Sequence, residues 1–181
     1  MNKLAPFSLR AATAITMVAM LAGCASSANW EAMTPTAVAT TKKLPQTVSV
    51  KTSGGSATGA MDSSSIGNDD LKAAIEKSIT QSKLFAAVVP VGGEDYELSV
   101  AITRLSKPTF GLAFTVEMEA GWVLVKRSDK TMVWRKSVQS SYTASMSDAF
   151  VGVKRLQMAV EGAARQNIEQ GLKAIESAEI R

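Results

Sequence analysis

The chain has 181 residues, with 20 basic and 16 acidic side chains and a formal net charge of +4. Lys3 and Arg10 supply half of that excess and precede a predicted cleavage point, so the charge gives little reason to expect nucleic acid as a partner. Histidine is absent, which excludes Ser-His and Cys-His nucleophile pairs and histidine metal sites. The single cysteine excludes an internal disulfide, so the fold must rest on packing.

The N-terminus has the three parts of an export signal. Lys3 and Arg10 are positive, an apolar run covers residues 11–21, and the small residues Ala22 and Gly23 follow. A membrane-spanning helix needs about 20 apolar residues, and this run is shorter. Residues 1–23 are therefore predicted to be a cleaved signal peptide. The alternatives are an ordinary secretory signal cut elsewhere and an uncleaved anchor.

Residues 21–24 read Leu-Ala-Gly-Cys, which resembles the lipobox of bacterial lipoproteins. The resemblance implies that Leu21, Ala22 and Gly23 are recognised by the signal peptidase, which cuts just before Cys24. It further implies that Cys24 carries a diacylglycerol and an added acyl group such as palmitate. Ala25 stands where enteric lipoproteins retained at the inner membrane carry aspartate. We therefore expect the protein to be anchored at the periplasmic face of the outer membrane.

The next two regions have few apolar positions. Residues 24–43 are rich in Ala, Ser and Thr and are predicted to be a lipidated flexible tether. Alternating residues from Leu44 to Thr52 predict a first strand. The Gly- and Ser-rich loop 53–67 follows. It lacks the Gly-Lys-Ser/Thr ending of a phosphate-binding loop and is interpreted as a linker.

A helix is predicted from Asn68, as its N-cap, to about Phe85. Three strands with period-two alternation are predicted over 95–105, 111–126 and 131–144. The second of these is long, so we expect a bend or bulge near Gly121. Residues 145–148 read Ser-Met-Ser-Asp, the form of a capping box, and precede a helix to about Ser177.

This order predicts an α+β fold, a two-layer sandwich of a mainly antiparallel four-stranded sheet with two helices on one face. Residues 44–177 would form a single periplasmic domain, and 178–181 a short tail. Ser, Thr and Glu side chains would line the uncovered face of the sheet.

One pair of carboxylates is spaced for chemistry. Glu117 and Glu119 are two residues apart on a strand, so they share a face at about 7 Å. The alternative is a solvated sheet surface beside the Lys and Arg residues of the next strand, and we prefer it. No catalytic, cofactor-binding or metal-binding residue is assigned.

The lipobox, the element order and the domain size together resemble small periplasmic lipoproteins of Gram-negative envelopes. Two such families are the lipopolysaccharide-assembly lipoproteins and the auxiliary lipoproteins of ABC-type lipid transport systems. The resemblance implies a non-catalytic binding or assembly module, held at the membrane by its lipid anchor, with an envelope protein or lipid as partner. The alternatives are a lipid-binding auxiliary component of a transport system and an enzyme using surface carboxylates.

Overall fold

The computed structural model describes residues 27–56, 58 and 65–180. The described chain contains the following helices and strands in order: α2 (Trp30–Met33), β1 (Leu44–Ser53), α3 (Asn68–Ser82), β2 (Phe85–Val88), β3 (Tyr96–Ser106), β4 (Phe114–Lys126), β5 (Met132–Ala144) and α4 (Gly152–Glu176).

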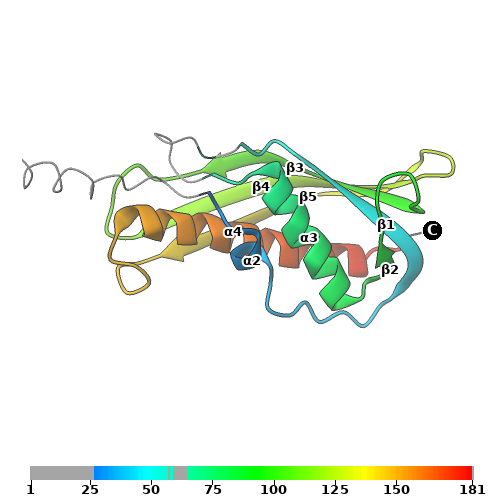
Figure 1. Ribbon diagram of the computed structural model, residues 1–181, viewed down its shortest axis with the longest axis horizontal. Coiled ribbons are helices and arrows are strands. Elements are labelled where there is room, and N and C mark those ends of the chain that lie inside the picture. Colours follow the sequence, from blue (N-terminus) through cyan, green and yellow to red (C-terminus); the bar gives the residue numbers. More distant parts are fainter. Residues whose placement is uncertain (1–26, 57, 59–64, 181) are drawn as a thin grey trace, which may run out of the picture.

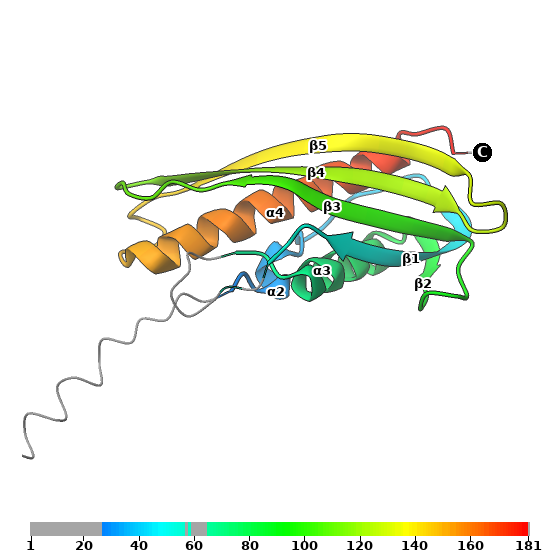
Figure 2. The same ribbon diagram turned by 90° about the horizontal axis from the view of Figure 1, so that it is seen from above.

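The strands form one mixed sheet in the order β2-β1-β3-β4-β5. β1 pairs parallel with both β2 and β3, whereas β3, β4 and β5 form an antiparallel meander. Figure 2 shows the sheet as one layer with the helices on one side of it. The predicted α+β class is confirmed. The predicted four strands and two helices are wrong in number, because β2 and α2 are added.

β2 is the strand that sequence analysis missed. It has four residues, too few for a period of two to be recognised. Its place is set by α3, which crosses over and returns the chain parallel to β1, with Leu44 opposite Phe85 and Val48 opposite Val88. Leu84 and Phe85 are buried at this point and hold the strand to the core.

The meander follows the predicted alternation. The inward side chains of β4 are all buried, namely Phe114, Val116, Met118, Ala120, Trp122 and Leu124. The bend or bulge expected near Gly121 is present as a bulge in the partner strand β3, opposite Ala120 and Glu119, while the pairing of Gly121 itself is regular. The irregularities lie between Ile102 and Arg104 and between Leu124 and Val125. β4 also starts at Phe114, later than predicted, and leaves Leu112 exposed.

Both predicted helix caps are wrong. Gly67 is the N-cap of α3, and the Asn68 side-chain oxygen instead accepts a hydrogen bond from the Gly55 N–H at 2.9 Å. Asp148 accepts hydrogen bonds from the Ser145 N–H and hydroxyl at 2.7 and 2.8 Å. This closes a turn ahead of α4, which begins at Gly152. The polar pattern of 145–148 serves the turn rather than the helix.

The largest fully buried side chain of the described residues, Trp122, lies between the sheet and α4. Trp122 is fully buried, and its indole N–H donates to the Asn167 side-chain oxygen at 3.0 Å. The Asn167 side-chain nitrogen in turn donates to the Val138 carbonyl at 2.8 Å, so both ends of this buried side-chain amide are hydrogen-bonded. The Trp122 ring lies against Gly171, where a larger residue would not fit. The two layers are therefore in direct contact.

Residues 27–43 lie against the domain, which does not fit the predicted flexible tether over 24–43. Ala28, Met33 and Val38 are buried in the core. At the end of the segment, the Lys42 ammonium donates to the Ala178 carbonyl. The sequence did not predict these contacts, because the three buried residues are too widely spaced to form a helical or strand pattern. Three buried side chains are nevertheless enough to hold the segment against the domain.

Candidate functional site

The lipidation residue Cys24 and the recognition residues Leu21, Ala22 and Gly23 lie outside the described residues. Ser27, the first described residue, is held by α4. Gln157 donates to the Ser27 carbonyl at 3.1 Å, and the Asn29 N–H donates to the Glu161 carboxylate at 3.0 Å. Gln157 also donates to Glu161 at 2.9 Å. The predicted lipid site is thus connected to the first half of α4.

Glu161, which helps to make this connection, and Arg155 are charged helix residues of the kind that is usually exposed. Glu161 is buried because the N-terminal segment covers it, and Arg155 is buried one and a half turns earlier. Arg165 donates to the Ala32 carbonyl at 3.0 Å, which fixes α2 to the same helix. The sequence did not indicate that Glu161 and Arg155 are buried, because a charged residue on a helix is usually exposed.

The uncovered face of the sheet is polar, as predicted. The hydroxyls of Thr115 and Thr143 lie 2.8 Å apart, and Lys51 pairs with Glu97 at 2.7 Å. Glu119 accepts a hydrogen bond from the Ser137 hydroxyl at 2.8 Å and lies 3.9 Å from the Arg104 guanidinium. Glu117 is exposed on the same face. The carboxylate pair therefore belongs to a surface network of cross-strand contacts.

β5 is an edge of the sheet. It is 13 residues long, and among the described strands it pairs with β4 alone. Lys136 is exposed on this strand, whereas Ser140 is buried and donates to the Ala163 carbonyl of α4 at 2.8 Å. The exposed charges of Arg135 and Lys136 are typical of edges that resist indiscriminate pairing. The Val138 carbonyl already accepts a hydrogen bond from Asn167, and the remaining backbone groups of the outer edge are presented to a selected partner.

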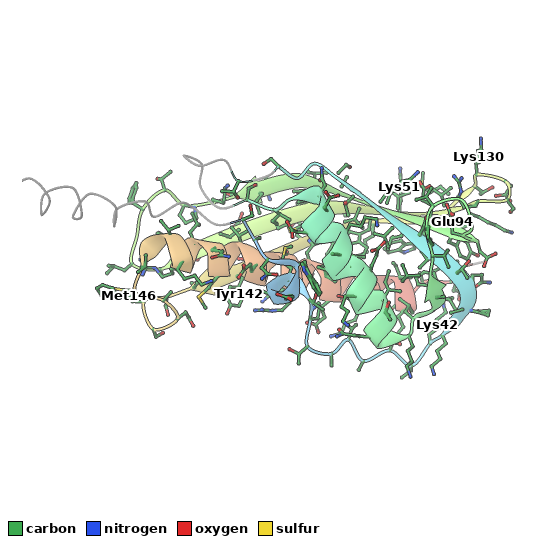
Figure 3. All side chains as sticks on the ribbon, viewed as in Figure 1. Lys42, Lys51, Glu94, Lys130, Tyr142 and Met146 are labelled. Atoms are coloured by element: carbon green, nitrogen blue, oxygen red, sulfur yellow. The ribbon has the colours of Figure 1, made fainter. Side chains whose placement is uncertain are left out.

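A polar hollow of about 660 Å³ lies at the end of the molecule opposite the start of α4, where Figure 3 labels Glu94. The Arg127 guanidinium approaches Glu94 at 3.0 Å and Glu97 at 3.5 Å. Burial acts to raise the pKa of Glu94. The Gly92 N–H donates to this carboxylate, and that bond, together with the positive charge of Arg127, outweighs burial and lowers the pKa. A carboxylate kept ionised and paired in this way is a poor general acid.

Asp95 connects the first and third strands at this hollow. Its carboxylate accepts hydrogen bonds from the Thr47 N–H at 2.8 Å and the Thr47 hydroxyl at 2.9 Å. These two bonds lower the pKa of Asp95 below its ordinary value of 3.8. The charged form is therefore favoured by folding, and Asp95 serves as a cross-link between strands.

Replacing Asp95 with asparagine is expected to lower the free energy of unfolding at neutral pH. The contribution of a carboxylate whose pKa is lowered by folding is present above its unfolded pKa and is lost as pH falls through the folded value. The deficit of Asp95→Asn against the parent should therefore shrink as the pH falls below about 3.8. Urea unfolding of both proteins across this range measures it, and a deficit that stays constant in acid would contradict the assignment.

Across residues 27–56, 58 and 65–180, no cluster of three or more Asp, Glu, His or Cys side chains is arranged to hold a metal ion. Within the same residues, no helix has the length and apolarity to cross a membrane.

Solved structures share this fold at low sequence identity. A Xanthomonas campestris protein of the family DUF330 matches with a TM-score of 0.56 and 15% identity, over 77% of this chain and 94% of that chain. A hypothetical protein from Chlamydia trachomatis matches at 0.51 and 8%, over 73% and 96%. A dodecameric PelC variant from Paraburkholderia phytofirmans matches at 0.51 and 12%, over 81% and 95%.

The likeness is one of fold. No protein-family model matches the sequence, and no curated protein matches it. The resemblance to lipopolysaccharide-assembly and ABC-transport auxiliary lipoproteins remains a prediction from the layout.

Proposed function

We propose that this chain is a lipoprotein of the Gram-negative envelope, anchored through Cys24 at the periplasmic face of the outer membrane. Support comes from the residues 21–24 and from the fact that the chain's single cysteine falls at the position that the modification requires. Two or more acyl chains hold a protein stably on a bilayer, so no spanning helix is needed.

The folded body acts as a non-catalytic binding module. The chain has no histidine, and the two carboxylates at the polar hollow, Glu94 and Asp95, have lowered pKa values and fixed partners. Glu119 is engaged by Ser137. These carboxylates contribute to the structure and are poorly suited to proton transfer.

The long free edge of β5 is the observation that carries the binding function. A strand of 13 residues beside one neighbour can accept a further strand through main-chain hydrogen bonds. The PelC structure is a dodecamer, so a second copy is one candidate for the added strand and another envelope protein is the other. A lipid-carrier role is less favoured, because Trp122 occupies the space between β4 and α4, and the hollow of about 580 Å³ beside β1, β2 and α3 is open at the surface rather than enclosed between the layers.

Photo-crosslinking in intact cells tests the edge. A photoreactive residue at Arg135 or Gln139, both exposed on β5, is expected to give one crosslinked product of the same mass. The same residue at Lys77, exposed on α3, is the matched control and should give none. The product's mass distinguishes a second copy from another protein. Equal crosslinking at all three positions, or none on β5, would contradict the proposal.

A further inference from the structure

Exposed apolar side chains gather at one end of the molecule. They come from the connection between β3 and β4 and from the connection between β5 and the first turn of α4, and Figure 1 shows both connections at the end where α4 begins. Phe110 is 86% exposed and Phe150 83% exposed. The set consists of Phe110, Leu112, Met146, Phe150, Val151 and Val153, and we call it the apolar tip.

The apolar tip is held in place by a buried charge. The Arg155 guanidinium donates to the carbonyls of Ala149 and Phe150 at 2.8 and 3.2 Å, and to the Gly111 carbonyl at 3.3 Å. It also lies over the Phe114 ring, 4.9 Å from the ring centre. One side chain thus ties both connections together. The two phenylalanines point to solvent from a braced framework, which indicates a contact surface rather than incomplete packing.

The predicted lipid site lies next to the apolar tip. Ser27 is bound by Gln157, four residues after Val153, which corresponds to about 6 Å along the axis of α4. Three residue steps separate Ser27 from Cys24, a reach of at most about 11 Å. A bilayer that holds the acyl chains of Cys24 is therefore within reach of the apolar tip. Figure 3 labels Met146 at this end.

The charges at this end suit the same surface. At the surface of the two connections and the first turn of α4, Lys107 and Lys154 stand against a single acid, Asp148, while Arg155 adds a buried positive charge beneath them. Asp148 is engaged by Ser145 within its own turn. Apolar side chains surrounded by a basic excess match the boundary between acyl chains and anionic headgroups.

We propose that the apolar tip inserts into the interfacial layer of the membrane that holds Cys24, so that the domain stands end-on with the start of α4 toward the bilayer. This inference rests on the proposed function and adds an orientation to it. The polar hollow at the opposite end then faces the periplasm, and β5 extends away from the membrane along its length, accessible to a partner.

Nitroxide labels on the full lipidated chain test the orientation. Because acylation consumes the thiol of Cys24, a cysteine introduced at Phe110, Phe150 or Met132 is the only free thiol. Met132 is the matched control, an apolar side chain 52% exposed at the first residue of β5, next to the turn whose Lys130 is labelled at the opposite end in Figure 3. The protein is reconstituted in vesicles of phosphatidylethanolamine and phosphatidylglycerol.

Labels in Phe110→Cys and Phe150→Cys are expected to collide more with dissolved oxygen and several-fold less with a water-soluble nickel chelate than the label in Met132→Cys. Equal nickel accessibility at the three positions would overturn the proposal. Protection at positions 110 and 150 from both reagents, with crosslinks between copies, would overturn it in favour of a protein contact. Mass spectrometry of the same sample separates the two failures, because an acylated chain with unprotected tips contradicts only the orientation.

Discussion

Replacing Cys24 with alanine is expected to move nearly all of the protein from the membrane fraction to the soluble periplasmic fraction. Each buried methylene contributes about 0.8 kcal/mol, and the diacylglycerol on Cys24 supplies the acyl chains that make anchoring stable. The described residues contain no helix that could span the bilayer in its place. The apolar tip alone is too small to compensate, since its six side chains penetrate only the interface. Flotation of membranes from cells that express each protein measures the shift.

Ser26→Ala is the matched control, because it changes a neighbouring residue and leaves the cysteine and the residues 21–23 intact. It should float with membranes as the parent does. A Cys24→Ala protein that still floats like the parent would contradict lipid anchoring and would favour the uncleaved apolar run as the anchor.

Gly171→Ala is expected to lower the free energy of unfolding by about 2 kcal/mol. A methyl group at this position would lie 2.5 Å from the Trp122 ring, well inside van der Waals contact. The ring is fully buried and its N–H is bonded to Asn167, so it has little freedom to move. Helix propensity favours alanine by about 1 kcal/mol, and overpacking exceeds this gain. Thermal unfolding should show a midpoint lower by roughly 4–8 °C.

Gly121→Ala is the control for this substitution. Gly121 lies on β4, beside Trp122 in sequence, and a methyl group there meets no atom within 4 Å. It should leave the midpoint unchanged or raise it slightly. If Gly171→Ala is as stable as Gly121→Ala, the close approach of α4 to the sheet is not as tight as described.

The meander and the long helix could be predicted from the sequence because each has one solvent-exposed face and one buried face. Tyr96, Leu98 and Val100 alternate with more exposed neighbours on β3, and β4 repeats the pattern. Because one face of each strand is buried and the other faces solvent, apolar and polar residues alternate with a period of two. The outward Glu117 and Glu119 were correctly interpreted as surface residues for the same reason.

Other parts could not be predicted, because they depend on contacts between distant segments. Glu161 and Arg155 look like exposed helix residues until Asn29 and Gly111 are placed against them. β2 is too short to show a period. The apolar tip was hidden differently. Leu112 and Val153 fit the apolar patterns of the predicted strand and helix. The structure shows that β4 starts at Phe114, after Leu112, and that Val153 lies in the first turn of α4, where it remains exposed.

Intact-mass and N-terminal peptide mass spectrometry of the mature protein tests the central claim most directly. The account predicts a chain that begins at residue 24, with a diacylglycerol on the Cys24 sulfur and a third acyl group on its amino nitrogen. A mature chain that begins at another residue, or one that begins at Cys24 without fatty acids, would contradict it.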